Sequence, residues 1–247
     1  MTTIAEFAAL HRSAEPLVLF NIWDAGSAIA VEQAGARAIA TGSLSLAGAQ
    51  GYGDGEDIPF EVLLAIVRRI AASVNAPLTV DFETGFGIDE AALARNATAL
   101  REAGAIGCNL EDRLLDGAGL RPVAEQARRI ATVAAQGLFI NARTDVFLAA
   151  LMTGDNPNRR ELVDQAIERA ASYSEAGAGC FFAPGLGDLD LIGALCEAVS
   201  LPVNIMHLDG MDNAELARCG VARISYGPAP WRQAMAALAE QARAAMQ

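Results

Sequence analysis

Eight short apolar segments rich in β-branched residues recur along this chain, and amphipathic segments separate them. This periodicity predicts that the short segments are strands and that the longer segments between them are helices. The clearest predicted helices are Phe60–Ser73 and Arg159–Ala176. The predicted strands are Leu17–Asn21, Arg37–Thr41, Leu78–Phe82, Ile106–Leu110, Leu138–Ala142, Gly179–Ala183, Pro202–Met206 and Ala222–Tyr226.

Three joints between a predicted helix and the next strand share one phrase: EQAGA at Glu32–Ala36, and EAGA at Glu102–Ala105 and Glu175–Ala178. Glycine commonly ends a helix in the left-handed conformation before a strand begins. Eight strand–helix units in 247 residues match the size of a (β/α)8 barrel. We therefore expect an α/β fold, with one TIM-type barrel domain over residues 1–247. A doubly wound open sheet is the alternative, but it usually has fewer strands, and no dinucleotide-binding fingerprint follows the first strand.

The basic residues restrict the chemistry of any site. All 18 are arginine, because the chain has no lysine, and this excludes Schiff-base aldolases, pyridoxal phosphate attachment and a P-loop lysine. Only two histidines are present, His11 and His207, so a site with several histidine ligands is also excluded. A catalytic site must therefore use mainly carboxylates, arginines, hydroxyls and backbone groups.

Charge and cysteine usage indicate the setting in which the protein works. The net charge of −12 argues against nucleic acid and against an anionic membrane as partners. No apolar run reaches the roughly 20 residues of a membrane helix. The N-terminal segment carries Glu6 and Glu15 and lacks the basic start of a secretory signal. The four cysteines form no close pairs, which is typical of reduced thiols, so we expect a cytoplasmic protein.

Acidic side chains gather where the predicted strands end. Asp81 and Glu83 follow the third strand, Glu111 the fourth, and Asp54 lies in the loop after the second. In such a barrel the carboxyl ends of the strands face the active site. Like charges at one opening require a cation, and oxygen ligands without histidine suit Mg2+, or Mn2+ as a second possibility. Acids that only cap helices are the alternative, which four converging carboxylates disfavour.

Two further features of the strand ends suit an anionic substrate. Arg143 directly follows the fifth strand and offers a two-pronged donor for a carboxylate or phosphonate, although a salt bridge to Glu111 is compatible with that role. The segment Gly42, Ser43 and Leu44 offers backbone N–H groups, unless it forms only a plain turn.

Five segments together carry a resemblance to a known family. They are NIWDAGSAIAVEQAGARAIATGSLSLAGAQGYGDGE, VDFETGFG, GCNLEDRL, INARTDVFL and PVNIM. They resemble the isocitrate lyase/phosphoenolpyruvate mutase superfamily, and the match extends from about Leu17 to Trp231. The resemblance implies a (β/α)8 barrel that binds Mg2+ and small 2-oxo acids, and that makes or breaks C–C or P–C bonds through an enolate. It also implies a homo-oligomer, either a dimer or a tetramer.

The resemblance also implies roles for individual residues. Asp81 matches the direct metal ligand, and Asp54, Glu83 and Glu111 match residues that hold water on the metal. Gly42, Ser43 and Leu44 match the cradle of a substrate carboxylate, to which we add Trp23, Asp81 and Asn204 as substrate-binding residues. Arg143 matches the substrate-binding arginine. We expect Arg143, Glu111 and Asp54 to take part in catalysis.

Two positions depart from the family pattern. Glu83 stands where members usually have aspartate, and the loop Arg113–Arg121 lacks the Lys-Lys-Cys-Gly-type sequence whose cysteine is the general acid of the lyases. The resemblance therefore leaves the proton donor open, and Asp112, Asp116, Tyr52 and His207 are the candidates.

Three functions remain. The first is a Mg2+-dependent lyase or decarboxylase that cleaves a C–C bond in a small 2-oxo or 2-hydroxy dicarboxylate. The second is a P–C bond hydrolase or mutase that acts on phosphonopyruvate. The third is a non-catalytic protein that binds a 2-oxo acid. An acid placed in the site favours catalysis over binding.

Overall fold

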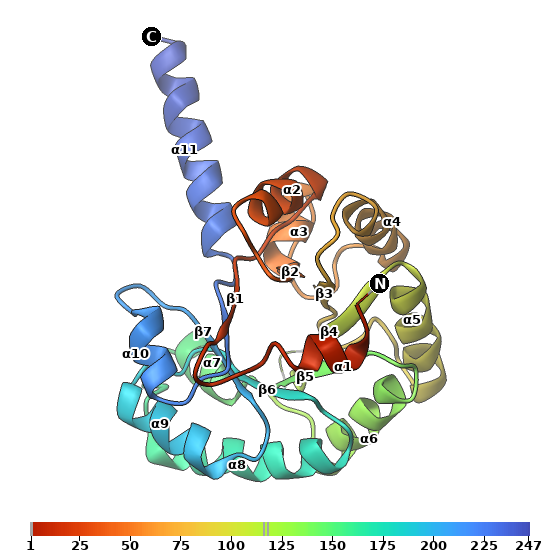
Figure 1. Cartoon of the computed structure of the whole chain (residues 1–247), viewed down its shortest axis with the longest axis vertical. Coiled ribbons are helices and arrows are strands. Elements are labelled where there is room, and N and C mark those ends of the chain that lie inside the picture. The colour runs from red at the N-terminus through yellow and green to blue at the C-terminus, as the bar shows by residue number, and fades with distance from the viewer. Residues whose placement is uncertain (1, 116, 118) are drawn as a thin grey trace.

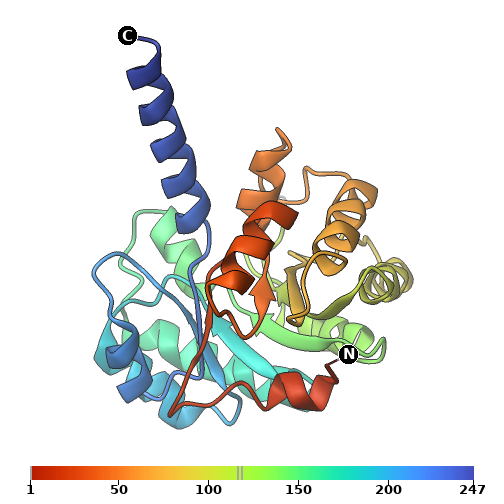
Figure 2. The same cartoon turned by 45° about the horizontal axis from the view of Figure 1, so that its top comes forward.

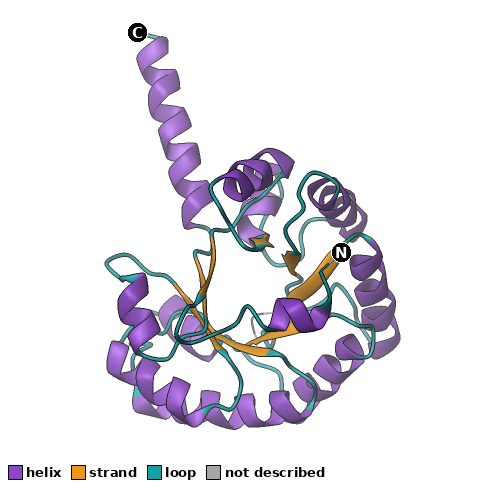
Figure 3. Ribbon diagram, in the orientation of Figure 1, coloured by secondary structure: helices purple, strands orange, loops and turns teal. Residues whose placement is uncertain are grey.

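Eight parallel strands form one sheet that curls into a barrel, and helices surround it (Figures 1 and 3). The computed structural model describes residues 2–115, 117 and 119–247. The strands follow one another in space as β1-β8-β7-β6-β5-β4-β3-β2, and one parallel bridge between Ile22 and Thr41 joins the two ends. This arrangement confirms the predicted TIM-type barrel and excludes the open sheet. The strands are β1 (Leu17–Leu19), β2 (Ile39–Ala40), β3 (Leu78–Asp81), β4 (Ala105–Glu111), β5 (Phe139–Arg143), β6 (Cys180–Ala183), β7 (Val203–Met206) and β8 (Arg223–Ser225).

The first two strands are shorter than predicted, and a side chain adds hydrogen bonds where the barrel closes. Nδ2 of Asn21 donates to the carbonyl of Thr41 at 2.8 Å. Oδ1 of Asn21 accepts the backbone N–H groups of Tyr226 and Gly227, each at 2.9 Å. Asn21 therefore connects β1, β2 and β8 at the carboxyl end of the barrel, directly beside the site described below.

The helices lie between successive strands. The two clearest predictions are confirmed to within two residues, as α4 (Phe60–Ala71) and α8 (Arg160–Glu175). Glycine ends the preceding helix at the shared joints, for example Gly104 with φ 109° and Gly177 with φ 99°. The other helices are α1 (Ile4–Ala8), α2 (Ala25–Gln33), α3 (Ser43–Ala49), α5 (Glu90–Glu102), α6 (Val123–Ala134), α7 (Val146–Met152), α9 (Leu189–Ala198), α10 (Asn213–Arg218) and α11 (Ala229–Ala245). None of the helices in the described part of the chain is both long and apolar enough to span a membrane.

The amino end of the barrel is closed by the N-terminal segment, which packs against β4 and β5. Phe7 is fully buried and meets the ring of Phe139 edge-on, with centroids 5.1 Å apart. His11 stacks on the same Phe139 ring at 4.7 Å. These side chains, together with Leu17 and Leu19, fill the lower interior of the barrel, so any ligand must enter from the carboxyl end.

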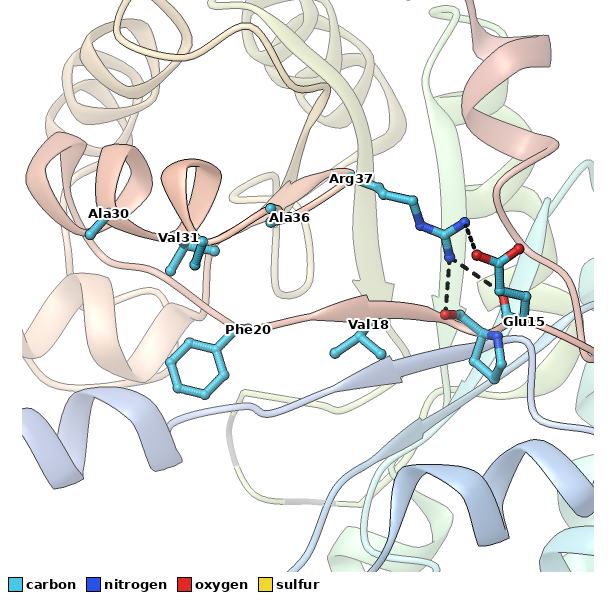
Figure 4. Close-up of a pocket in the computed structure, with 10 residues that line it drawn as sticks. Glu15, Val18, Phe20, Ala30, Val31, Ala36 and Arg37 are labelled. Atoms are coloured by element: carbon cyan, nitrogen blue, oxygen red, sulfur yellow. Dashed lines mark hydrogen bonds and ion pairs between the residues drawn. The ribbon is translucent and has the colours of Figure 1, made fainter.

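The last helix does not cover the barrel. α11 projects away from it in two views that differ by 45° (Figures 1 and 2). Apolar side chains along this helix face solvent, including Leu238 with 59% exposure. Beside the N-terminal end of α11, a groove of about 590 Å³ lies between β1 and α2 (Figure 4). Val18 and Phe20 line the groove and are 38% and 43% exposed, so the outer face of β1 lacks the helix that covers the other strands.

Candidate active site

A pocket of about 470 Å³ opens at the carboxyl end of the barrel, where the strand ends converge. Six predicted residues line it, together with Asn109 and Arg113. These six are Gly42, Ser43, Leu44, Asp54, Asp81 and Arg143. Apolar residues also line the pocket, among them Leu148, Leu151, Met152, Pro184, Met206 and Leu208. The pocket therefore offers charged groups for an acid and apolar groups for a carbon skeleton.

Asp81 is the last residue of β3 and is held at both carboxylate oxygens. Oδ2 accepts the backbone N–H of Ser43 at 3.1 Å, and Oδ1 accepts Nδ2 of Asn109 at 3.3 Å. The backbone N–H of Asp81 donates to Oγ1 of Thr41 at 2.9 Å. Each carboxylate oxygen retains acceptor capacity, because a carboxylate has about four acceptor positions. Asp81 is thus oriented by the protein and still able to bind a cation.

Glu83 lies just beyond the strand, in a left-handed backbone conformation with φ 48°. The strand ends at Asp81, so strand alternation does not position Glu83. Its side chain is 3% exposed, and Oε2 accepts the backbone N–H of Glu56 at 2.9 Å. Burial and then the charges of Asp81 and Glu111 raise the pKa of Glu83 to about 9. A bound divalent cation would reduce this repulsion between like charges.

Glu56 ties the loop that carries Asp54 to the loop after β3. Its Oε1 accepts the N–H of Thr84 at 2.9 Å, the hydroxyl of Thr84 at 2.6 Å and the N–H of Phe86 at 3.0 Å. Glu56 itself has a positive φ of 63°. Glu56 was not predicted as a site residue, because the sequence of a polar loop does not show which groups an acidic side chain in it contacts.

Glu111 ends β4 and lies between two arginines. Its Oε1 accepts Nε of Arg113 at 3.0 Å, and its Oε2 lies 2.8 Å from Nη1 of Arg143. Glu111 is 1% exposed, and this burial raises its pKa although both arginines lower it. Arg143 also donates through Nη2 to Asp145 at 2.9 Å. The predicted Arg143–Glu111 contact is thus present at the edge of the pocket.

The remaining predicted residues occupy other positions. Asp54 lines the pocket from an exposed loop. Asn204 on β7 is fully buried, and neither of its amide atoms has a hydrogen-bond partner in the described structure. Trp23 is half-buried at the start of α2, and neither Trp23 nor Asn204 belongs to the described lining of the pocket. Their substrate-binding roles stay predictions.

Three of the four candidate proton donors lie in the described part of the chain, and these three are outside the pocket lining. Asp112 is fully buried and accepts the hydroxyl of Tyr173 at 2.9 Å and Nη1 of Arg169 at 3.1 Å. His207 stacks on the ring of Tyr226 with centroids 4.6 Å apart. Tyr52 is 36% exposed on its loop, and Asp116 lies outside the described residues. Within the described chain, none of the other three is a pocket-lining acid.

The donor set fits a hard divalent cation that keeps part of its water. No three carboxylate, imidazole or thiolate groups among the described residues come close enough to enclose a cation by themselves. Mg2+ is commonly held by one or two carboxylates and several waters. The direct-ligand role of Asp81 and the water-holding roles of Asp54, Glu83 and Glu111 stay predictions.

The family model described as phosphoenolpyruvate phosphomutase matches residues 7–246. The chain belongs to this family. A solved protein of Burkholderia cenocepacia J2315, classed as a phosphonomutase, is 45% identical with a TM-score of 0.93, over 98% of this chain and 99% of that one. The 2-methylisocitrate lyase of Escherichia coli K12 is 30% identical over 199 residues, which are 80% of this chain and 67% of the lyase.

One more distant structure shares the fold. A phosphonopyruvate hydrolase solved with oxalate and Mg2+ is 23% identical, with a TM-score of 0.84, over 97% of this chain and 85% of that one. The predicted resemblance to the isocitrate lyase/phosphoenolpyruvate mutase superfamily is therefore confirmed, and the protein belongs to a superfamily of enzymes that includes lyases.

Proposed function

We propose that this protein is a Mg2+-dependent enzyme that cleaves a C–C bond in a small 2-oxo or 2-hydroxy dicarboxylate. The observation that carries this proposal is the position of Asp81, a doubly anchored carboxylate that shares one pocket with Arg143. The E. coli 2-methylisocitrate lyase supports C–C cleavage, and the oxalate and Mg2+ of the phosphonopyruvate hydrolase support the cofactor.

One set of residues would bind the substrate, and another would bind the metal. Arg143 is oriented by Glu111 and Asp145 and donates to the acid group of the substrate. Ser43 and Leu44 line the same pocket at the start of α3. The N–H of Ser43 already holds Asp81, so the N–H of Leu44 is the neutral donor for the acid group. Asp81 would hold the cation, and Asp54, Glu83 and Glu111 would accept hydrogen bonds from its waters. The bound Mg2+ would supply positive charge that stabilises the enolate charge formed as the bond breaks.

The second candidate is P–C bond cleavage in phosphonopyruvate, by hydrolysis or by a mutase reaction. The absence of cysteine from Arg113–Arg121 favours hydrolysis, the absence of lysine there disfavours the mutase reaction, and the likeness to the Burkholderia protein supports P–C chemistry. Cys108 and Cys180 are fully buried inside strands, and burial raises the pKa of both thiols to about 12. A reaction in which water protonates the enolate requires no thiol, and both oxaloacetate decarboxylation and P–C hydrolysis meet this condition.

The experiment is a comparison of oxaloacetate, phosphonopyruvate, isocitrate and 2-methylisocitrate, followed by release of pyruvate or glyoxylate. We expect cleavage of oxaloacetate or phosphonopyruvate, loss of activity with EDTA, and no loss after iodoacetamide treatment of the native protein. Cleavage of isocitrate that alkylation abolishes would contradict this reading of the loop. If Mg2+ and oxalate bind but none of the four substrates turns over, the protein is a 2-oxo-acid binder.

We also propose that the protein is a homo-oligomer in which α11 of one copy occupies the groove of another. The groove exposes Val18 and Phe20, and the projecting α11 exposes Leu238 (Figure 4). Covering an apolar groove with an apolar helix face removes both surfaces from water. Light scattering on Phe20→Glu should show a smaller species than the wild type. Ile88→Glu, at a 99% exposed site elsewhere, is the control; a monomeric wild type, or an unchanged mass for Phe20→Glu, would contradict the proposal.

A further inference from the structure

Arg223 is a buried arginine in the lining of the pocket. It begins β8, pairs in register with Asn204 of β7, and is 1% exposed. Its Nη2 donates to Oδ1 of Asn109 at 3.2 Å, whereas Nε and Nη1 have no hydrogen-bond partner in the described structure. No carboxylate within the described residues forms a salt bridge with it. Burial accordingly lowers the pKa of Arg223 to about 10.

Burying such a residue lowers the stability of the folded protein. A buried cation loses its hydration, and two unpaired N–H donors add to that cost. Replacing a buried charge with an apolar side chain of similar volume is often neutral or stabilising. Stability therefore gives no reason for an arginine here, and its contact with Asn109 is the feature that remains to be explained.

Asn109 connects Arg223 to Asp81. Its Oδ1 accepts Nη2 of Arg223 and also Nδ2 of Asn141, the latter at 2.8 Å. Its Nδ2 then donates to Oδ1 of Asp81 at 3.3 Å. These three side chains come from β8, β4 and β3, so the chain of hydrogen bonds crosses the interior of the barrel.

The direction of this chain is set at its two ends. An asparagine amide can turn either way and Asn141 can donate or accept, but the ionised carboxylate of Asp81 only accepts and therefore faces the NH2 group of Asn109. A guanidinium only donates. Arg223 therefore requires the oxygen of Asn109 on its own side, and this places the NH2 group of Asn109 against Asp81.

We propose that Arg223 is a positioning residue for the metal-binding carboxylate Asp81 and acts by fixing the amide of Asn109. This inference rests on the proposed metal site of the enzyme. With the amide fixed, Oδ1 of Asp81 is held by Asn109 while Oδ2 is held by the N–H of Ser43. With the amide reversed, the Asn109 oxygen meets the carboxylate, which must move away.

The test is a double-mutant cycle on Mg2+ affinity, measured by titration calorimetry on wild type, Arg223→Met, Asn109→Ala and the double variant. We expect Arg223→Met to weaken Mg2+ binding roughly tenfold, which is the size of one charge-assisted hydrogen bond. The sign is informative, because removal of a nearby positive charge would by itself strengthen the binding of a cation. In the Asn109→Ala background the same change should not weaken binding further.

Two variants complete the test. Arg223→Lys keeps a charged group that only donates and should restore affinity to within about threefold. Ile224→Val, on the same strand but in the hydrophobic core outside the described pocket lining, should leave affinity unchanged. Unchanged or tighter Mg2+ binding by Arg223→Met, or equal weakening in both backgrounds, would overturn the proposal.

A crystal structure of metal-free Arg223→Met separates this inference from the proposed function. Without Arg223 the oxygen of Asn109 keeps only Asn141 as a donor, so we expect the Asn109 side chain to move away from Asp81 and Asp81 to leave the N–H of Ser43. If both contacts persist, the positioning role is wrong even where Mg2+ binds. If the wild type binds no Mg2+, the proposed function fails, and the distance between Asn109 and Asp81 still decides whether Arg223 positions Asp81.

Discussion

Nη1 of Arg143 lies 2.8 Å from Oε2 of Glu111, across the boundary between β5 and β4. The Nε and Nη2 groups of the same guanidinium donate to the two oxygens of Asp145. A guanidinium has five N–H groups, so three are engaged here and two remain for a ligand. Arg143 thus balances two buried carboxylates and can still bind the acid group of a substrate.

The first prediction concerns that double role. Arg143→Ala should abolish Mg2+-dependent oxalate binding and should also lower the free energy of unfolding by about 3–5 kcal/mol, because Glu111 and Asp145 stay buried without their partner. Titration calorimetry and urea unfolding measure the two effects. Arg143→Ala combined with Glu111→Gln should recover part of the stability but no oxalate binding. Recovery of both would show that Arg143 acts on the ligand only through Glu111.

The second prediction concerns the direct metal ligand. Asp81→Asn should weaken Mg2+ binding at least tenfold, because an amide oxygen lacks the charge that attracts the cation. Asp57→Asn is the matched control, since Asp57 accepts the N–H of Gly53 at 2.8 Å and lies outside the described pocket lining. Calorimetry with equal Mg2+ affinities for both variants would remove Asp81 from the metal site.

The sequence predicted the barrel and the pocket for one physical reason. Parallel strands all end at the same opening, so residues at strand ends, such as Asp81, Glu111 and Arg143, converge whatever lies between them. Periodicity identifies the strands, and the position in each strand then identifies the site. Ser43 and Asp54 follow by the same argument, because both lie between β2 and α4, Ser43 at the start of α3 and Asp54 in the loop after it.

The hydrogen-bond network around the site was not predictable in this way. Arg223 is far from Asp81 in sequence and lies in a short apolar strand, where it resembles any strand residue. Its role depends on which nitrogen meets Asn109, and that follows from the packing of side chains within the barrel. The position of Glu83 was not predictable for another reason. Its backbone is left-handed, so a turn determines the direction of its side chain, and strand alternation does not apply there.

The third prediction concerns Glu56, which joins the two loops at the rim of the pocket. Glu56→Ala leaves the N–H groups of Thr84 and Phe86 without their acceptor and should cost about 1–3 kcal/mol in unfolding free energy. Glu56→Gln keeps an acceptor oxygen and should retain most of that stability. Hydrogen exchange should locate the loss at residues 84–86.

The control for Glu56 is Glu61→Ala, an exposed change in the first turn of α4. Surface changes of this kind usually shift the unfolding free energy by less than about 0.5 kcal/mol. Equal effects of Glu56→Ala and Glu61→Ala would mean that the hydrogen bonds of Glu56 to Thr84 and Phe86 contribute nothing measurable to the unfolding free energy.

The fourth prediction concerns His11 in the closed end of the barrel. Its Nδ1 lies 3.1 Å from the carbonyl of Phe7, which can only accept, so the proton of the neutral ring is on Nδ1. Nε2 is buried without a partner in the described structure. Burial, and then the positive charge of Arg223, lower the pKa of His11 from 6.5 to about 3.

The sign of the pH dependence follows from this depressed value. Below pH 6.5 the unfolded chain takes up a proton on His11 and the folded protein does not, so the unfolding free energy falls as the pH falls toward 3. At pH 5 the loss should be about 2 kcal/mol, at 1.36 kcal/mol for each pH unit. Urea unfolding of wild type and His11→Phe at pH 7.5 and pH 5 measures it, because the contributions of the carboxylates are common to both proteins. The stability difference between them should shift in favour of His11→Phe by about that amount. A difference that is independent of pH would mean that water reaches His11 through the closed end of the barrel.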